Sequence, residues 1–314
     1  MQNLAYGFDS QGHRGTRGLA PENTLVAFAK ALSIGVTTLE LDVAATRDGI
    51  IVVSHDPRLN PSLTRDAYGD WIDEPGPAIR SLRLDDLKTY DVGRSKPGSR
   101  YAGRYPDQVP VDGTHIPTLQ EVFQLVRRSG NETVRFNIET KLQPGQPDLF
   151  LNPEEFVASV MDVIVEQGFL NRVTIQSFDW RTLQETQRTV PNVPTSYLSA
   201  QQNWLDNIGV GKPGPSAWTA GYDIDDYDGS VPQLIQAAGG SIWSSFHLEV
   251  SSAKIKQAHD LGLEVKVWTV NDEARMEALI GMGVDGIITD YPDRLRAVLE
   301  RLGMAIPTPT PVSP

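Results

Sequence analysis

From Pro117 onward the sequence alternates between short apolar runs of strand length and longer segments with helical spacing. A helix over Leu119–Arg128, for example, is followed by a strand over Val134–Thr140 and a helix over Pro153–Gln167. Strands that alternate with helices form a parallel sheet, because a crossover must carry the chain back to the start of the next strand. This rhythm predicts an α/β fold.

Eight segments in the whole chain have the character of barrel strands. They lie near residues 8–13, 36–43, 134–140, 172–177, 195–199, 241–244, 264–269 and 285–289. Eight strand–helix units predict a closed (β/α)8 TIM barrel, formed by a single domain over residues 1–314. In such a barrel the C-terminal ends of all strands meet at one mouth, and the active site lies there.

Local signals refine this outline near the N-terminus. Pro21 is expected to open a helix at its first turn, where the missing N–H costs nothing, and Gly35 is expected to end that helix. The run Ile50–Ser54 is expected to form part of a hairpin rather than a barrel strand. Asp179 is expected to cap the helix that follows the fourth barrel strand.

Two segments fall outside the strand–helix rhythm. Residues 57–115 are rich in Pro, Gly, Asp, Arg and aromatic residues and are too long for an ordinary barrel connection. We interpret them as a small cap subdomain inserted after the second barrel strand, because the aromatic residues argue against disorder. Residues 305–314 form a proline-rich tail that we expect to be flexible.

Polar side chains gather at the predicted strand ends. They are His13, Glu40, Asp42, Glu139, Lys141, Gln176, Trp268 and Asp290, with His55 after the hairpin. Glu40 and Asp42 share one strand face, and paired carboxylates suit Mg²⁺ or Ca²⁺. Histidines beside them suit proton transfer near neutral pH, and Arg14 suits a bound phosphate or carboxylate. The pattern therefore predicts one site at the barrel mouth.

Composition narrows the possible partners. The formal net charge of -12 opposes non-specific binding to nucleic acid or to an anionic membrane surface. The 314 residues include no cysteine, which excludes thiolate chemistry and Cys-ligated zinc. No apolar run is long enough to span a bilayer, and residues 1–6 do not resemble a signal peptide. We expect a cytoplasmic protein, or a periplasmic or secreted one if a signal peptide was removed.

The motifs at these positions, taken in order, resemble those of the glycerophosphodiester phosphodiesterase family. The matching motifs are His13–Gly15, Pro21–Thr24, Leu39–Val43, Thr46–Gly49, His55–Asp56, Ile116–Leu119, Ile138–Lys141, Ser177–Phe178, Trp268–Asn271 and Gly283–Asp290. The resemblance covers nearly the whole chain, with one minor departure at Thr140.

The resemblance implies hydrolysis of small glycerophosphodiesters to sn-glycerol 3-phosphate and an alcohol, with one divalent cation, Mg²⁺ or Ca²⁺. The implied metal ligands are Glu40, Asp42 and Glu139, the implied acid–base pair is His13 and His55, and Arg14 and Lys141 would hold the phosphate. The family mechanism makes the substrate's own glycerol 2-hydroxyl the first nucleophile. The preferred alcohol, the cation and the oligomeric state stay open.

Two other functions remain as alternatives. A lysophospholipase D or sphingomyelinase D activity would use the same histidines and metal on a lipid substrate, and an apolar ridge at the entrance would favour it. A non-catalytic phosphate-binding protein would be favoured by the loss of a histidine, but both are present.

Several polar residues have competing structural interpretations. Trp268 is expected either in the barrel core or in contact with glycerol, and Glu22 is expected to be a structural partner of Arg14. His115 and His259 are expected to have structural or exposed positions, and His247, after the sixth strand, is expected either to reach the mouth or, as we favour, to have a loop role.

Overall fold

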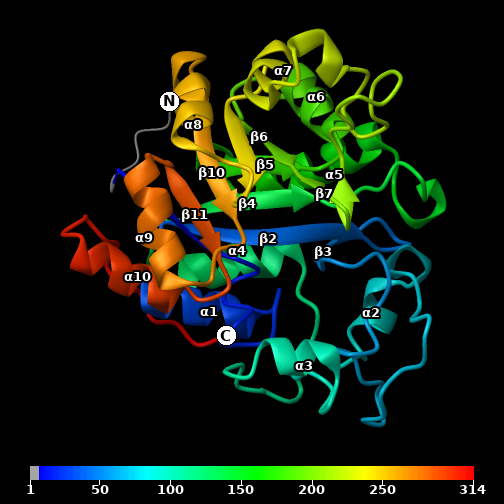
Figure 1. The fold of residues 1–314 in the computed structure, drawn as a ribbon. Helices are drawn as coiled ribbons and strands as arrows, with labels where there is room; N and C mark the ends of the chain where they lie inside the picture. The colour runs from blue at the N-terminus through cyan, green and yellow to red at the C-terminus, as the bar shows by residue number, and fades with distance from the viewer. Residues whose placement is uncertain (1–6) are drawn as a thin grey trace.

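A closed barrel of eight parallel strands forms the centre of the protein, with helices around it (Figure 1). The computed structural model describes residues 7–314, so the interpretation of residues 1–6 lies outside the described residues. β1 pairs with both β11 and β2, which closes the barrel and confirms the predicted fold. The barrel strands are β1 (Asp9–Gly12), β2 (Thr38–Ala45), β4 (Arg135–Thr140), β5 (Val173–Ser177), β6 (Thr195–Ser199), β9 (Ile242–Phe246), β10 (Glu264–Trp268) and β11 (Gly286–Thr289).

Three short strands lie outside the barrel wall. β3 (Ile51–Val53) runs antiparallel to β2, with Val43 opposite Val53, so the predicted hairpin is confirmed. β7 (Gln201–Gln202) and β8 (Leu205–Asp206) form a small hairpin after β6 that the sequence pattern did not predict.

The helices follow the predicted segments closely. Around the barrel they are α1 (Leu25–Ile34), α4 (Leu119–Arg128), α5 (Pro153–Glu166), α6 (Trp180–Thr189), α7 (Val231–Ala237), α8 (Ser252–Asp260), α9 (Glu273–Met282) and α10 (Pro292–Arg301). Short helices are α2 (Leu84–Leu87), α3 (Arg100–Arg104), η1 (Ile79–Ser81), η2 (Pro147–Leu149), η3 (Leu170–Arg172) and η4 (Ile224–Tyr227). Asp179 caps α6 as predicted, because its side chain accepts from the Arg181 backbone N–H.

The start of α1 was predicted wrongly. The helix begins at Leu25 rather than at Pro21, and the Thr24 hydroxyl caps it by accepting from the backbone N–H of Ala27 at 3.2 Å. Asn23 has a φ of 55°, in the left-handed region that an α-helix cannot use. Its side-chain amide donates to Asp42 at 2.9 Å, so a contact to the predicted site holds these residues out of the helix.

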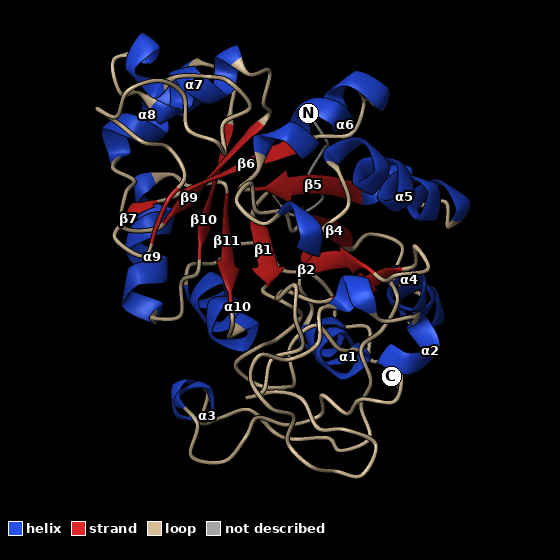
Figure 2. Ribbon diagram, turned by 90° about the vertical axis from the view of Figure 1, so that its right-hand side faces the viewer, coloured by secondary structure: helices blue, strands red, loops and turns tan. Residues whose placement is uncertain are grey.

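The apolar core lies between the strands and the surrounding helices (Figure 2). Aromatic rings fill part of it: Phe123 stacks on Phe169 with ring centroids 4.6 Å apart and meets the edge of Phe136 at 4.8 Å. The barrel interior is instead polar along several strands, where Gln11, Asn137 and Gln176 are buried. The outer layer therefore provides most of the hydrophobic stabilisation.

Residues 57–115 fold as an irregular segment beside β2 and β3, with α2 and α3 within it (Figure 1). They share a second, smaller apolar core with the β2–β3 hairpin, formed by Ala44, Val52, Leu59, Ile79, Leu87 and Ile116. Arg65 ties the segment together, since its side chain contacts both Asp91 and Asp112. The assignment of this segment as a separate subdomain stays a prediction.

The C-terminal tail lies against the barrel helices. The Thr310 backbone N–H donates to the Leu32 carbonyl at 2.9 Å, and Arg296 donates to the Pro307 carbonyl at 2.8 Å. The expected flexibility of residues 305–314 stays a prediction. Within residues 7–314, no helix has the length and apolar character needed to cross a bilayer.

Candidate active site

A cavity of about 1040 Å³ opens at the C-terminal ends of the barrel strands. Most of the residues predicted for the site line it: His13, Arg14, Glu40, His55, Glu139, Lys141, Gln176, Trp268 and Asp290. Asp42 lies just below them, fully buried beside Glu40 and Glu139. The structure therefore brings the predicted residues together at one mouth.

A tight turn after β1 positions His13 and Arg14. Arg14 has a φ of 49°, a strained value for a residue with a side chain. Glycines make the turn possible, because a Cβ on Gly12 would lie 2.2 Å from the Gly15 carbonyl oxygen and one on Gly15 would lie 2.7 Å from the Ala27 backbone. The turn aims the Arg14 backbone N–H at Glu40, where it donates at 2.7 Å.

Three carboxylates form a buried cluster. β2 and β4 are neighbours in a register that places Asp42 opposite Glu139, and Glu40 lies on the same face of β2 as Asp42. One oxygen from each of the three carboxylates lies within 4.8 Å of the others. Glu40 and Asp42 are each only 1% exposed.

Burial and mutual repulsion shift the pKa values in this cluster. Burial raises the pKa of Glu40, with the charges of Asp42 and Glu139 adding to the effect. Burial also raises the pKa of Glu139 to about 7, against the opposing effect of Lys141. Burial alone would raise the pKa of Asp42, but Lys141 and Arg14 outweigh it and hold that pKa well below its usual range.

Two cations border the cluster. Lys141 donates to Glu139 at 2.6 Å and lies 3.4 Å from Asp42 Oδ1, and the Arg14 Nε lies 3.3 Å from Asp42 Oδ2. Arg14 also donates to Glu22 at 2.6 Å, which confirms the predicted structural pairing. Much of the Arg14 charge is therefore directed to a fourth carboxylate rather than to the cluster.

The cluster fits one hard divalent cation. Its donors are carboxylate oxygens, which Mg²⁺ and Ca²⁺ prefer. Within residues 7–314, the buried Asp42 Oδ1 has no hydrogen-bond partner, and its only close cation is Lys141 at 3.4 Å, so it can still accept a ligand. A cation at this point would offset the repulsion that raises the pKa values of Glu40 and Glu139.

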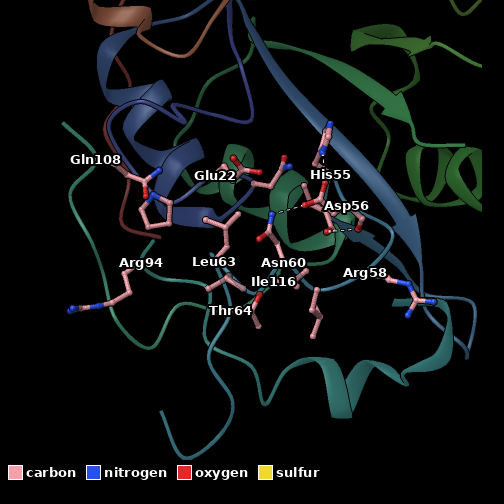
Figure 3. Close-up of a pocket in the computed structure, with 16 residues that line it drawn as sticks. Glu22, His55, Asp56, Arg58, Asn60, Leu63, Thr64, Arg94, Gln108 and Ile116 are labelled. Atoms are coloured by element: carbon pink, nitrogen blue, oxygen red, sulfur yellow. Dashed lines mark hydrogen bonds and ion pairs between the residues drawn. The ribbon is translucent and has the colours of Figure 1, made fainter. Parts of the chain in front are cut away.

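Each predicted catalytic histidine is paired with a carboxylate through Nδ1. His13 Nδ1 lies 2.6 Å from Asp290, and His55 Nδ1 lies 2.7 Å from Asp56. Figure 3 shows the His55–Asp56 pair, with Asn60 donating to the second Asp56 oxygen at 2.9 Å. A carboxylate on Nδ1 favours the tautomer that carries the proton there, which leaves Nε2 free for proton transfer.

Sequence reasoning missed the roles of these carboxylates. Asp56 follows His55 directly, and Asp290 follows the last strand. Their positions stand out in the sequence, but position alone does not assign them a role. Asp290 is also held by Arg17 at 2.8 Å and by Asn271 at 2.7 Å. No sequence spacing signals such a cluster, because its members come from opposite ends of the chain.

The surroundings of both histidines favour their neutral form. Burial lowers the pKa of His13 to about 4, with Arg17 and Arg14 adding to the effect and Asp290 opposing it. Burial likewise lowers the pKa of His55, followed by the effects of Arg14 and Lys141. A bound anionic phosphate would oppose the effect of these cations and raise both pKa values.

Aromatic rings form one wall of the cavity. Trp268 meets Phe178 with ring centroids 5.3 Å apart, Phe246 at 5.6 Å and Trp204 at 6.2 Å. Trp204, in the turn between β7 and β8, is 60% exposed. Trp268 therefore faces the cavity rather than the barrel core, and its contact with glycerol stays a prediction.

The remaining histidines have other partners. His259 pairs with Asp285 at 2.8 Å, His115 contacts the Tyr90 carbonyl, and His247 contacts Arg275. These contacts agree with the structural positions expected for them.

Comparison with known proteins agrees with this geometry. Residues 13–294 match the model of the glycerophosphoryl diester phosphodiesterase family. The chain belongs to this family. It is therefore an enzyme that hydrolyses phosphoric diesters, and the family explains why histidines and carboxylates meet at the mouth of a TIM barrel.

Individual relatives cover nearly the full length of the chain. A glycerophosphodiester phosphodiesterase from Caldanaerobacter subterraneus is 27% identical, over 93% of this chain and 97% of the relative. The human lysophospholipase D GDPD3 is 26% identical, over 94% of this chain and 86% of the relative. A crystal structure from Silicibacter pomeroyi, provisionally named glycerophosphoryl diester phosphodiesterase, is 34% identical with a TM-score of 0.84 and 96% coverage of both chains.

A more distant neighbour shares the fold. A phosphodiesterase from Oleispira antarctica, solved with the product sn-glycerol-3-phosphate, is 23% identical with a TM-score of 0.66, covering 93% of this chain and 96% of that one.

The raised pKa of Glu139 predicts that a cation at the cluster would bind with an affinity that depends on pH. A pKa raised to about 7 favours the protonated form of Glu139 at lower pH, and a cation would have to displace that proton. The affinity for Mg²⁺ should therefore rise with pH through this range. Calorimetry in buffers of different ionisation enthalpy should show more protons released per ion at about pH 6 than at about pH 8. Equal release at both pH values would contradict the raised pKa.

Proposed function

We propose that this enzyme hydrolyses glycerophosphodiesters to sn-glycerol 3-phosphate and an alcohol, using one divalent cation, Mg²⁺ or Ca²⁺. Glu40, Asp42 and Glu139 would hold the cation. The observation that carries the proposal is the carboxylate cluster beside two histidines in a chain of this family, each histidine paired with a carboxylate.

The residues of the site suit a two-step reaction. When bound, the cation neutralises phosphate charge and eases deprotonation of a neighbouring hydroxyl. Arg14 and Lys141 bind the non-bridging phosphate oxygens. His55 accepts the proton of the glycerol 2-hydroxyl as that oxygen attacks phosphorus, and His13 protonates the departing alcohol oxygen. In the second step the two histidines exchange roles as water opens the cyclic phosphate.

Replacing either catalytic histidine should lower turnover without unfolding the protein. His13→Ala and His55→Ala should each lower turnover of glycerophosphocholine by about 10²-fold or more, because each removes one proton-transfer group. His259→Ala is the matched control, since His259 pairs with Asp285 before β11, at the opposite end of the barrel. Turnover is measured on purified protein whose melting temperature matches that of the parent chain.

Two results would contradict the proposal. A variant at His13 or His55 with nearly unchanged turnover would remove that residue from the mechanism. Turnover that survives exhaustive chelation would show that the reaction does not use a divalent cation.

An apolar ridge at the entrance favours a second substrate class, the lysophospholipids. Phe246 continues the wall formed by Trp268 and Trp204, and all three side chains line the cavity. If Trp268 contacts the glycerol, an acyl chain on that glycerol would extend over Trp204. Lysophospholipase D activity is thus the second candidate function.

Replacing Trp204, whose indole is exposed, should affect activity on the two substrates differently. Trp204→Ala should lower kcat/KM for lysophosphatidylcholine by about tenfold or more, since an apolar contact of this size contributes about 1.5–3 kcal/mol. It should change kcat/KM for glycerophosphocholine by less than about threefold, because that substrate has no acyl chain. Trp71→Ala, in the 57–115 segment and away from the cavity lining, is the control. An equal loss on both substrates would contradict the acyl-chain contact.

Four residues of the 57–115 segment line the cavity, namely Pro57, Arg100, Arg104 and Tyr105, and we propose that this segment selects the leaving alcohol. Tyr101 on α3 donates to Glu22, and Tyr105 packs under Arg17 with the guanidinium 4.8 Å from its ring centroid. These contacts dock α3 so that Arg100 and Arg104 line the cavity. Within the described chain, neither arginine forms an ion pair, so both can attract an anionic group on the alcohol.

The two arginines should favour alcohols that carry a carboxylate. Replacing both Arg100 and Arg104 with Ala should lower kcat/KM for glycerophosphoserine relative to glycerophosphocholine by about three- to tenfold, as expected for loss of partly exposed charge contacts. Arg94→Ala is the matched control in the same segment, because Arg94 already pairs with Asp112. An unchanged ratio would show that α3 does not select the alcohol.

A further inference from the structure

A continuous chain of side-chain hydrogen bonds runs through the barrel interior. Gln11 Nε2 donates to Asp9 at 2.8 Å, and Asn137 Nδ2 donates to Gln11 Oε1 at 2.8 Å. Asn137 Nδ2 also donates to Gln176 Oε1 at 2.8 Å, and Gln176 Nε2 donates to Glu40 Oε1 at 2.8 Å. All of these residues are buried. The chain thus links Asp9, at the start of β1, to the carboxylate cluster at the mouth.

The two ends of this chain fix the direction of every bond in it. Asp9 is ionised, and Glu40 must also be ionised when it binds a cation, so in the cation-bound site both carboxylates only accept hydrogen bonds. Each glutamine must therefore turn its NH₂ group outward to a carboxylate and its carbonyl oxygen inward. The two inward oxygens both need a donor, and the NH₂ group of Asn137 supplies one hydrogen to each.

The Asp9 end is held firmly. Thr38 and Thr37 hydroxyls donate to Asp9 Oδ1 at 2.6 and 2.9 Å, and Arg135 and Lys266 lie 3.0 and 3.3 Å from Oδ2. Lys266 and Arg135 hold the Asp9 pKa well below its usual range in spite of burial. Asp9 is therefore a permanent acceptor, and Gln11 cannot reverse.

We propose that Asn137 and Gln176 are positioning residues, which set the orientation of Glu40 for cation binding by fixing which end of the Gln176 amide faces it. The inference rests on the proposed cation site. Gln176 and the Arg14 backbone N–H each donate to one Glu40 oxygen, so they leave the carboxylate with one defined rotation and its remaining lone pairs toward the cluster. A reversed Gln176 would present its carbonyl oxygen and repel Glu40.

A space-filling role alone does not account for Asn137. Apolar branched side chains fill the interior of most TIM barrels. Burying an amide is unfavourable unless it is hydrogen-bonded, and within residues 7–314 the buried Asn137 Oδ1 has no partner. What the asparagine contributes is its pair of donors.

The test compares one substitution in two backgrounds. Asn137→Asp keeps the side-chain size but replaces the double donor with acceptors, so Gln176 should reverse toward it and repel Glu40. Binding of Mn²⁺ alone, followed by the electron paramagnetic resonance signal of the free ion, should weaken by about tenfold relative to the parent chain. In a Gln176→Met background the same substitution should change the affinity by less than about threefold, because no amide is left to reverse.

The comparison excludes simpler effects. The negative charge added at position 137 acts in both backgrounds and cancels between them. Ser196→Ala is the control for general disturbance of the interior, since among the described residues the buried Ser196 hydroxyl has no partner, and it should leave Mn²⁺ affinity unchanged. If Asn137→Asp does not fold, Asn137→Leu replaces it with the same direction of change expected, because leucine is similar in size and supplies no donor to the Gln176 carbonyl oxygen.

Two outcomes would overturn the inference in different ways. Equal changes in both backgrounds, or no change in either, would refute the positioning role while leaving the proposed function intact. If the parent chain binds no Mn²⁺ at all, the cation site is wrong, and the positioning role fails with it.

Discussion

Repulsion among Glu40, Asp42 and Glu139 is the constraint on which the rest of the site depends. Three buried carboxylates within 4.8 Å are unfavourable unless positive charge or donors surround them. The protein supplies Arg14, Lys141 and the amide of Gln176, and these partially offset the repulsion. The repulsion that remains favours a bound cation, whose positive charge would offset it.

The fold could be predicted from the sequence because its signals are local and repeated. Strand and helix periodicity located all eight barrel strands, and the cap at Asp179 marks a helix start that depends on neighbouring residues alone. Pro21 failed as a helix start because Asn23 is held by Asp42, a contact across the site that local propensity cannot register. Tertiary contact therefore overrode the local signal at the functional site.

Part of the candidate site could be predicted because the strands themselves could be. Residues at strand ends converge in any barrel, so His13, Glu40 and Glu139 could be grouped without a structure. The carboxylates behind the histidines and the polar interior could not be grouped in this way, because Asp290 reaches His13 from the last strand and Asn137 lies in the middle of one. Their roles depend on side-chain direction rather than on position along a strand.

The barrel thus has two kinds of interior. Near the mouth, charged groups line the cavity, while at the start of the strands Asp9 forms ion pairs with Lys266 and Arg135. TIM barrels usually divide stability and function between these two ends. Here the amides of Gln11, Asn137 and Gln176 join the two ends. The Asp9 carboxylate at the stable end therefore sets the direction of the hydrogen bonds that reach the functional end. A rigid acceptor at one end of the barrel can therefore determine the orientation of a carboxylate at the other.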